Sequence, residues 1–336
     1  MKETDDCEED DGLKSDPSDV SRSASEKTLE PVTTKPRPIP FDDFFRNLGV
    51  LFSAIYVVIL FVAFLVYGVI PGPELVVFVF FIYAAYNKRT RRFVRDWFPF
   101  VALILGYEAL NGLVPNLARG LHVIEPAFAD KQLFGAIPTL VLQQFFRNPI
   151  LDYVTAFFYS LHFILPILFA FILWKYASAY FSRFTLALIV GTYGALLTFI
   201  LYPVAPPWYG VNATRIMFQI DTNLSMPFYR SFLGLFQPNP FAAFPSLHAM
   251  YPWLISLYAL KIKKAKALPI LVLPFGVWFS TIYLGEHYVI DVIGAIIYGT
   301  CAFLLVEKAI PWLTRWFSTV RFLSSLFQRA PVTSRN

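Results

Sequence analysis

Eight long runs of apolar residues divide this chain of 336 residues, and they restrict its fold more than any other feature. A helix that crosses the hydrocarbon core of a membrane needs about 20 apolar residues, and its backbone polar groups bond within the helix. We therefore predict an all-α fold, a polytopic integral membrane helical bundle with about eight transmembrane helices. The runs cover residues 49–70, 74–87, 97–117, 151–174, 184–203, 246–260, 268–284 and 288–306. The run at 74–87 is short enough that a re-entrant segment is the alternative there.

Composition excludes an ordinary soluble domain. The chain is 57% hydrophobic, 18% aromatic and only 15% charged, whereas about 25% of the residues of an average soluble domain are charged. The net charge of +5 does not indicate nucleic acid, because the Lys and Arg residues gather in short segments between the apolar runs, where they act as topology signals. The two cysteines, Cys7 and Cys301, lie in a polar tail and an apolar run, so we expect no structural disulfide.

The chain divides into three parts by composition. Residues 1–40 are acidic and then rich in Ser, Thr and Pro, a composition that buries too little apolar surface to fold alone. We predict a disordered cytoplasmic tail there, a transmembrane domain over 41–310 and a basic cytoplasmic tail over 311–336. The N-terminus lacks a basic segment followed by an apolar one, so we expect no cleavable signal peptide.

Basic residues predict the orientation in the membrane, since they gather on the cytoplasmic side. With eight spans, every basic segment falls on the side of the N-terminal tail, which we therefore assign to the cytoplasm. The two long connections, 118–150 and 204–245, hold few basic residues for their length and fall on the extracytoplasmic or lumenal side. The basic segments are Lys88, Arg89, Arg91, Arg92 and Arg95 in one loop, Lys175 with Arg183, Lys261 with Lys263, Lys264 and Lys266, and Lys308, Arg315, Arg321 and Arg329 near the C-terminus.

Two segments place ionisable residues at the mouths of apolar runs, where a charge at bilayer depth costs about 2.5–3.5 kcal/mol and so points to function. AAFPSLHAM places Ser246 and His248 where a long connection turns into a helix. STIYLGEHYVIDVIGA places His287 and Asp291 at i and i+4, on one face of a helix. Both segments fall on the extracytoplasmic side of the predicted topology.

The spacing of His287 and Asp291 has a chemical meaning. An aspartate one turn after a histidine accepts the proton of one ring nitrogen, fixes the tautomer and leaves the other nitrogen as a nucleophile or base. His248 is then the opposite partner. A helix that begins at Ser246 would direct backbone N–H groups and the positive end of its dipole toward an anion such as a phosphate.

FPSLH, followed 39 residues later by the YLGEHYVID segment, resembles the second and third signature motifs of the type 2 phosphatidic acid phosphatase superfamily. The resemblance implies a core of six helices and assigns roles by motif position. His287 would form a phosphohistidine as the nucleophile, Asp291 would orient it, and His248 would protonate the leaving group. Ser246 would contact the phosphate, and Ser280 stands at the Ser position of the third motif.

Three departures separate this chain from the general pattern of that superfamily. Leu247 replaces the Gly of the second motif, Thr281 replaces the Arg of the third, and the first motif is missing. Two phosphate-binding cations are therefore unaccounted for. We expect an arginine of the long connections to place positive charge around the phosphate, with Arg215 as the first candidate. The other candidates are Arg119, Arg147 and Arg230.

In the slot of the first motif stands LYPVAPPWYG, which contains Pro207 and Trp208. Together with FPSLH and a third motif of the HYxxD type, this APPW segment resembles the inositol phosphorylceramide synthase branch and its prokaryotic relatives. The resemblance implies that Pro207 and Trp208 belong to the substrate site; a helix stop with an interfacial aromatic anchor is the alternative. RDWFPF at 95–100, LFGAIPT at 133–139 and YSLHFILP at 159–166 are similar too, so the resemblance covers about 95–306.

Members of that branch move a phosphoinositol or related head group from one lipid to the hydroxyl of another. The resemblance therefore implies a membrane lipid phosphotransferase acting on a phospholipid or sphingolipid. A lipid phosphate phosphatase of the same superfamily, of the phosphatidic acid or polyprenyl phosphate type, would use the same triad with water as the acceptor. A transporter or channel with a His and Asp proton relay is a third alternative, but the chain has no detectable inverted repeat of broken helices.

We expect no metal, no organic cofactor and no nucleic-acid partner. Glu286 beside His287 invites a zinc site, but a zincin helix reads H-E-x-x-H, and the chain has only four histidines, in distant segments. The other two histidines, His122 and His162, are interpreted as hydrogen-bonded structural residues.

Overall fold

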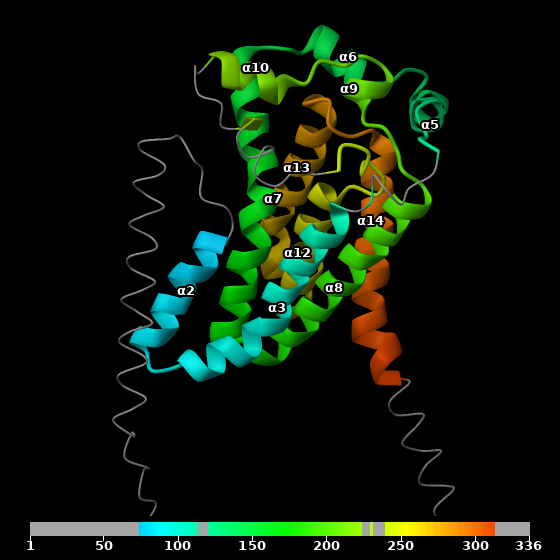
Figure 1. Ribbon diagram of the computed structural model, residues 1–336. Helices are drawn as coiled ribbons and strands as arrows, with labels where there is room; N and C mark the ends of the chain where they lie inside the picture. Colours follow the sequence, from blue (N-terminus) through cyan, green and yellow to red (C-terminus); the bar gives the residue numbers. More distant parts are fainter. Residues whose placement is uncertain (1–73, 113, 115–119, 224–228, 231–238, 313–336) are drawn as a thin grey trace, which may run out of the picture. The chain divides into compact units, whose positions relative to one another are not determined.

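The computed structural model describes residues 74–112, 114, 120–223, 229–230 and 239–312, all within one compact unit (Figure 1). The predicted tail at 1–40, the first apolar run at 49–70, Arg119 and most of the predicted C-terminal tail lie outside these residues. Their assignments therefore stay predictions.

The described residues are helical apart from short connections and two isolated backbone bridges, which confirms the predicted all-α class. Three of the helices, α6, α7 and α9, begin with a proline, where the missing N–H costs no hydrogen bond. In chain order the elements are α2 (Glu74–Tyr86), α3 (Thr90–Asn111), α5 (Ile124–Phe134), α6 (Pro138–Phe145), α7 (Pro149–Tyr176), α8 (Ser178–Leu201), α9 (Pro207–Gly210), α10 (Ile216–Asn223), α12 (Leu247–Lys263), the 3₁₀ helix η1 (Lys264–Leu271), α13 (Val272–Tyr283), α14 (Val289–Leu304) and the π-helical segment η2 (Leu305–Ala309).

The long helices form a bundle, and short helices cover one of its ends (Figure 1). α12 is central and packs against α7, α8, α13 and α14. The predicted connections 118–150 and 204–245 hold the short helices α5, α6, α9 and α10. The described parts of the long connections therefore form a folded cap over the bundle.

Three continuous helical stretches among the described residues are long and apolar enough to cross a membrane: Ser178–Leu201, Leu247–Tyr283 and Val289–Trp312. The two parts of α7, Pro149–His162 and Ile164–Tyr176, make a fourth if they are taken as one span. Several membrane-spanning helices are thus present as predicted, and the exact count of eight stays a prediction.

The stretch Leu247–Tyr283 folds back on itself. Lys264 takes a positive φ of 52° directly after α12, and η1 carries the chain on to α13. The indole N–H of Trp278 in α13 then donates to the carbonyl of Ala249, in the first turn of α12, at 3.0 Å. The two apolar runs predicted here, 246–260 and 268–284, are therefore two helices that lie side by side and antiparallel.

α3 begins at Thr90, earlier than the apolar run predicted from residue 97. Three of the five basic residues predicted in one loop therefore lie in the first turns of this helix. The reason is local, because Arg92 and Asp96 stand at i and i+4 and pair at 3.3 Å. The indole N–H of Trp174 in α7 also donates to Asp96, at 3.1 Å. Polar pairing thus extends the helix beyond its apolar part.

The end of α7, the start of α8 and the end of α12 lie at the end of the bundle opposite the cap (Figure 1), and each carries a basic residue: Lys175, Arg183 and Lys261. Arg183 of α8 and Lys261 of α12 both pair with Glu307 of η2, at 3.1 and 3.0 Å. Lys175 at the end of α7 lies 4.9 Å above the ring of Tyr83 in α2. The basic end and the cap are therefore opposite ends of one bundle, and the side of the membrane that each of them faces stays a prediction.

α7 is bent by 47° between its two parts, which end at His162 and begin at Ile164. Pro166 lies inside the helix. A proline has no N–H to bond the carbonyl four residues earlier, here that of His162, and its ring collides with that turn. The proline therefore accounts for the bend.

Close packing of α14 against the segment before α12 gives a first prediction. A Cβ added to Gly294 would lie 2.5 Å from the ring of Phe244, in the segment just before α12. Gly294→Ala must displace this ring, and overpacking of this kind costs about 1–3 kcal/mol. We expect a lower midpoint of thermal unfolding in detergent, followed by tryptophan fluorescence.

Gly194→Ala in α8 is the matched control for that change. Its added Cβ would meet Tyr298 at 3.7 Å, an ordinary contact, and alanine favours a helix over glycine by about 1 kcal/mol. A midpoint for Gly294→Ala equal to or above that of Gly194→Ala would contradict the close packing.

Candidate functional site

The starts of α12 and α14 lie side by side, and the two predicted motifs meet there. The predicted placement of His287 and Asp291 on one helix face is wrong, because α14 begins only at Val289 with Tyr288 as its N-cap, so His287 lies in the turn before the helix. Ser246 is the N-cap of α12, and its hydroxyl oxygen accepts the N–H of Ala249 at 3.3 Å. The backbone N–H of Ser246 donates to the carbonyl of Asp291 at 3.2 Å. This bond joins the two motifs directly, so that His248 in the first turn of α12 faces the start of α14.

The three predicted catalytic residues form one hydrogen-bonded chain. Nδ1 of His287 lies 3.4 Å from Oδ2 of Asp291, and Nε2 of His287 lies 3.1 Å from Nδ1 of His248. A carboxylate accepts, so the proton of the first pair sits on Nδ1 of His287 and the lone pair of this ring is on Nε2. Nδ1 of His248 then donates to that lone pair. Asp291 and His287 are 0% and 4% exposed, so the chain is held in a largely dry environment.

Two residues of α7 cover the ring of His248. The ring of Tyr159 stacks on it with centroids 4.5 Å apart, and the ring of His162 lies 3.8 Å away. Nδ1 of His162 lies 2.6 Å from the carbonyl oxygen of Tyr159, and since a carbonyl only accepts, this nitrogen carries a proton. That bond agrees with the interpretation of His162 as a hydrogen-bonded residue. Nothing in the sequence, however, placed it beside the predicted triad.

Arg215, the first candidate for a phosphate-binding cation, lies beside the third motif and is paired. Its Nε and Nη2 donate to the two carboxylate oxygens of Glu286 at 2.8 and 3.2 Å. The Tyr229 hydroxyl donates to the same carboxylate at 3.1 Å, and the guanidinium lies 4.5 Å from the ring of Trp208. Burial opposes the charge of Arg215, but Glu286 together with Tyr229 and Tyr159 outweighs it, so the pKa of the guanidinium is raised. Burial, reinforced by Glu286, also raises the pKa of Tyr229, which stays a neutral donor.

Gln143 of α6 holds the segment before Arg215 in place. Its side-chain amide donates to the carbonyls of Thr214 and Tyr283 at 2.8 and 2.9 Å. Its amide oxygen accepts the N–H of Thr214 at 2.8 Å. The cap is thereby tied to the end of α13. Sequence reasoning missed this residue, because a glutamine in a polar segment gives no signal until its partners are known.

The predicted APPW segment contacts the third motif through its backbone. The N–H of Trp208 donates to the carbonyl of Gly285 at 3.2 Å, and Pro207 is the buried first residue of α9. Gly285 has a φ of +83°, and an added Cβ would lie 2.6 Å from the carbonyl oxygen of Thr214. Only glycine fits this close approach.

The remaining predicted residues have partners of their own. The Ser280 hydroxyl donates to the carbonyl of Gly276 in its own helix at 2.6 Å. Arg147 donates to Gln219, and Arg230 donates to Thr222 at 3.3 Å. These contacts place Ser280 inside α13 and both arginines in the cap.

Asp130 of α5 caps α14 from a distant part of the chain. Its two carboxylate oxygens accept the N–H groups of Val289 and Ile290, each at 2.9 Å. Asp291 itself accepts the N–H of Tyr288 at 2.8 Å. Burial raises the pKa of Asp130, although the two N–H donors oppose the rise. Sequence reasoning missed Asp130, because a side-chain cap supplied by another helix leaves no local spacing to detect.

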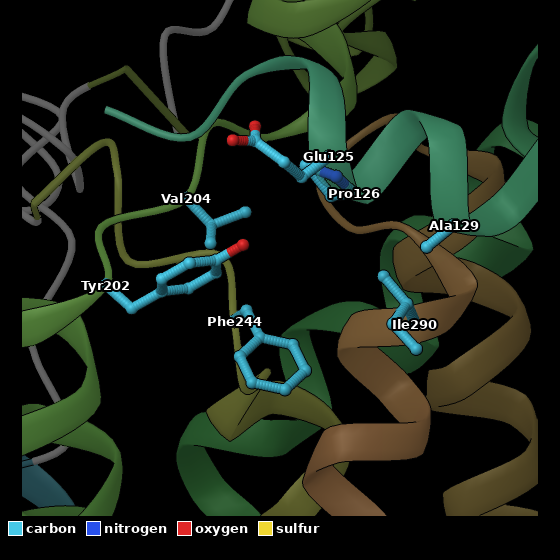
Figure 2. Close-up of a pocket in the computed structure, with 7 residues that line it drawn as sticks. All are labelled: Glu125, Pro126, Ala129, Tyr202, Val204, Phe244 and Ile290. Carbon is cyan, nitrogen blue, oxygen red and sulfur yellow. The ribbon is translucent and has the colours of Figure 1, made fainter. Parts of the chain in front are cut away.

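A cavity of about 290 Å³ adjoins the start of α14 (Figure 2). The Glu125 carboxylate and the Tyr202 hydroxyl are its polar groups, and Glu125 pairs with His122 at 2.9 Å. His122 also stacks on Tyr202 with centroids 3.7 Å apart, so this histidine contacts two of the lining residues. The lining residues are Glu125, Pro126, Ala129, Tyr202, Val204, Phe244 and Ile290.

In the part of the chain that the structure describes, no group of three or more His, Cys, Asp or Glu side chains is arranged to hold a metal ion. The chemistry available at the site is that of two histidines, an orienting carboxylate, and a buried ion pair next to them.

Comparison with known proteins gives a family. Residues 127–305, a little over half of the chain, match the PAP2 superfamily. The chain belongs to the PAP2 superfamily. The chain is also similar to the phosphoinositol dihydroceramide synthase of Bacteroides thetaiotaomicron, with 28% identity over 246 residues that cover 64% of this chain and 76% of the relative. No solved structure matches.

Membership in the PAP2 superfamily confirms the resemblance seen in the FPSLH and GEHYVID motifs, and the bacterial relative supports the inositol phosphorylceramide synthase-like branch. The protein is therefore an enzyme that acts on lipid head groups, as a phosphotransferase or a phosphatase. Its apolar helices make it an integral membrane protein.

Replacement of Asp130 tests whether the cap on α14 positions the neighbouring His287. Asp130→Ala leaves two part-buried N–H groups without their acceptor, and an unpaired buried group costs up to about 1–3 kcal/mol. We expect kcat of the head-group reaction to fall about 10–100-fold while KM stays within about twofold, because the residue holds the helix and not the substrate. Initial rates in lipid micelles measure both constants.

Two variants control that experiment. Lys131→Ala changes the exposed neighbour on the same helix and should leave both constants unchanged. Asp130→Asn keeps one acceptor oxygen and should lie between wild type and Asp130→Ala. A wild-type kcat in Asp130→Ala would show that the cap does not control the geometry of His287.

Proposed function

We propose that this PAP2 enzyme is a membrane lipid phosphotransferase that moves a phospho-head group, with phosphoinositol as the best candidate, from one lipid to the hydroxyl of another. The observation that carries the proposal is the hydrogen-bonded chain from Asp291 through His287 to His248 at the starts of two helices. The name of the bacterial relative, a phosphoinositol dihydroceramide synthase, supports the choice of head group and of a ceramide-type acceptor.

In the first proposed step, Nε2 of His287 attacks the phosphorus of the donor lipid. The bond from phosphorus to the oxygen of the departing lipid breaks, and His248 gives that oxygen its proton. The head-group phosphate is then held on His287, and Asp291 stabilises the positive charge of the substituted ring. The attacking and leaving atoms lie in line on opposite sides of phosphorus. The phosphate must therefore enter between the rings of His287 and His248, and the hydrogen bond that joins them in the free enzyme is broken.

In the second step, His248 accepts the proton of the acceptor hydroxyl. The hydroxyl oxygen attacks phosphorus, and the bond from phosphorus to Nε2 of His287 breaks, which restores the free enzyme. Water in place of the lipid hydroxyl would make the same triad a phosphatase. Arg215 and the Ser246 hydroxyl are proposed as phosphate contacts, with Pro207 and Trp208 beside the head group and Ser280 as a lesser candidate.

The charge at this end of the bundle favours a phosphodiester donor over a phosphomonoester. A phosphodiester carries one negative charge, whereas a phosphomonoester carries about 1.5–2 at neutral pH. Among the described residues, Arg147, Arg215 and Arg230 of the cap all have polar partners. Two cations of the general superfamily pattern are also missing from the motifs. A site with so little spare positive charge suits the monoanionic diester of a lipid head group, and so favours transferase over phosphatase.

The proposed active site faces the extracytoplasmic or lumenal side, with both chain termini in the cytoplasm. The proposal is supported by the position of the triad at the cap, opposite the basic end of the bundle (Figure 1). Basic residues favour the cytoplasmic side.

Head-group transfer tests the proposal. The purified enzyme in lipid is given phosphatidylinositol labelled in phosphate and inositol, with and without a ceramide or diacylglycerol acceptor. We expect both labels to move to the acceptor. His248→Ala should reduce the rate about 10²–10⁴-fold, and His287→Ala, which lacks the nucleophile, should reduce it to background. His122→Ala, a histidine outside the triad, is the control.

Other outcomes lead to other functions. Release of inorganic phosphate from a monoester lipid, without transfer, would make the enzyme a lipid phosphate phosphatase. If no phospholipid reacts and His287→Ala changes nothing, the catalytic proposal is wrong, and pH-dependent ion flux in vesicles would test a transporter instead.

A further inference from the structure

Glu286 lies between the proposed nucleophile and an arginine, and the mechanism above leaves it without a role. The turn after α13 fixes its direction, because the backbone N–H groups of Glu286 and His287 both donate to the carbonyl of Thr281 at 3.1 Å. With both backbone groups held by one acceptor, the two side chains leave in different directions. His287 points to His248, and Glu286 points to Arg215.

The Glu286–Arg215 pair is held firmly. The Glu286 side chain is 7% exposed and the Arg215 side chain 20%, and two parallel hydrogen bonds join them. The guanidinium also lies 4.6 Å from the ring of Phe218 and 4.5 Å from that of Trp208. Charges in such a largely buried site are screened far less than charges in water.

Tyr159 connects this pair with the triad, because its ring stacks on His248 with centroids 4.5 Å apart and lies 6.3 Å from the ring of Tyr229, whose hydroxyl donates to Glu286. A phosphate bound between His287 and His248 would therefore lie near a cation whose charge is already balanced by Glu286. A monoanion would still gain from the N–H groups of Arg215, while the second charge of a dianion would be repelled by the Glu286 carboxylate. Selection by an unfavourable charge is a common route to specificity.

We infer that Glu286 is a specificity-determining residue: by balancing Arg215, it admits monoanionic phosphodiesters to His287 and excludes dianionic phosphomonoesters. The inference rests on the proposed function. It assigns the preference for diester over monoester to one carboxylate and not to the triad, which serves both reactions.

Removal of this charge should open the site to monoester hydrolysis by the same steps. Nε2 of His287 attacks the phosphorus of phosphatidic acid, the bond from phosphorus to the glycerol oxygen breaks, and His248 protonates that oxygen. Water then gives a proton to His248 and attacks phosphorus, the bond from phosphorus to His287 breaks, and inorganic phosphate leaves.

Glu286→Gln tests the inference, since it keeps the size and one acceptor oxygen but removes the charge. Two rates are measured in the same mixed micelles: head-group transfer from phosphatidylinositol and phosphate release from phosphatidic acid. We expect the ratio of hydrolysis to transfer to rise at least about tenfold. An unchanged ratio would overturn the inference.

Two matched variants separate charge from hydrogen bonding. Tyr229→Phe removes the hydroxyl that donates to Glu286 without a change of charge, so its ratio should stay near that of wild type. Arg215→Gln combined with Glu286→Gln removes both charges, and the gain in hydrolysis should disappear. Persistence of the gain in the double variant would show that the released arginine is not its cause.

A measurement on the wild-type enzyme keeps the test valid if Glu286→Gln does not fold. At mildly alkaline pH, phenylphosphonate is a dianion and its monomethyl ester is a monoanion. The monoanion should inhibit transfer more strongly, by about tenfold, and stronger inhibition by the dianion would contradict the inference.

Transfer by the wild-type enzyme is measured first, because its absence would overturn the proposed function itself. If the wild-type enzyme transfers the head group and Glu286→Gln has the same ratio of hydrolysis to transfer, only the role of Glu286 is overturned.

Discussion

The position of the site depends on how the first turn of α14 is held. A helix begins with backbone N–H groups that have no partner inside the helix, and in this enzyme two buried carboxylates accept them. Asp130 comes from the cap and takes two of these groups, and Asp291 takes the N–H of Tyr288. Because His287 comes directly before Tyr288, the N-cap of α14, the bonds that hold the start of this helix also position the proposed nucleophile.

Further contacts connect this turn with α12 and α7. The carbonyl of Asp291 accepts the N–H of Ser246, which caps α12 and carries His248 to His287. α7 adds the rings of Tyr159 and His162 over His248. Most of these contacts are directional hydrogen bonds or ring contacts between different helices. In the low dielectric of a membrane-embedded bundle, such bonds are strong and leaving them unmade is costly.

The ion pair of Arg215 and Glu286 gives the site its electrostatic character. In the general superfamily pattern two motif cations surround the phosphate, and this chain lacks them. The structure instead holds one arginine, brought by the cap, against a carboxylate beside the proposed nucleophile. Gln143 and Gly285 make this possible, since one ties the arginine segment to α13 and the other allows the close approach of backbone. In the proposed function, the triad therefore operates with a different charge balance and on a different class of phosphate ester.

Apolar run length alone determined the all-α membrane class, because helix formation in hydrocarbon depends on residues close in sequence. The spacing of four residues also predicted the pairing of His287 with Asp291, but the predicted shared helix face is wrong, since His287 lies before α14 and only Asp291 belongs to that helix. Only the tertiary structure decided the roles of Asp130, Gln143, His162 and Glu286, whose partners lie up to 160 residues away. It also decided that the long connections fold into a cap and that α3 begins at Thr90. Hydrogen bonds between distant segments produce no period or spacing in a single sequence. The residues that position the site and set its charge could therefore be identified only from the folded structure.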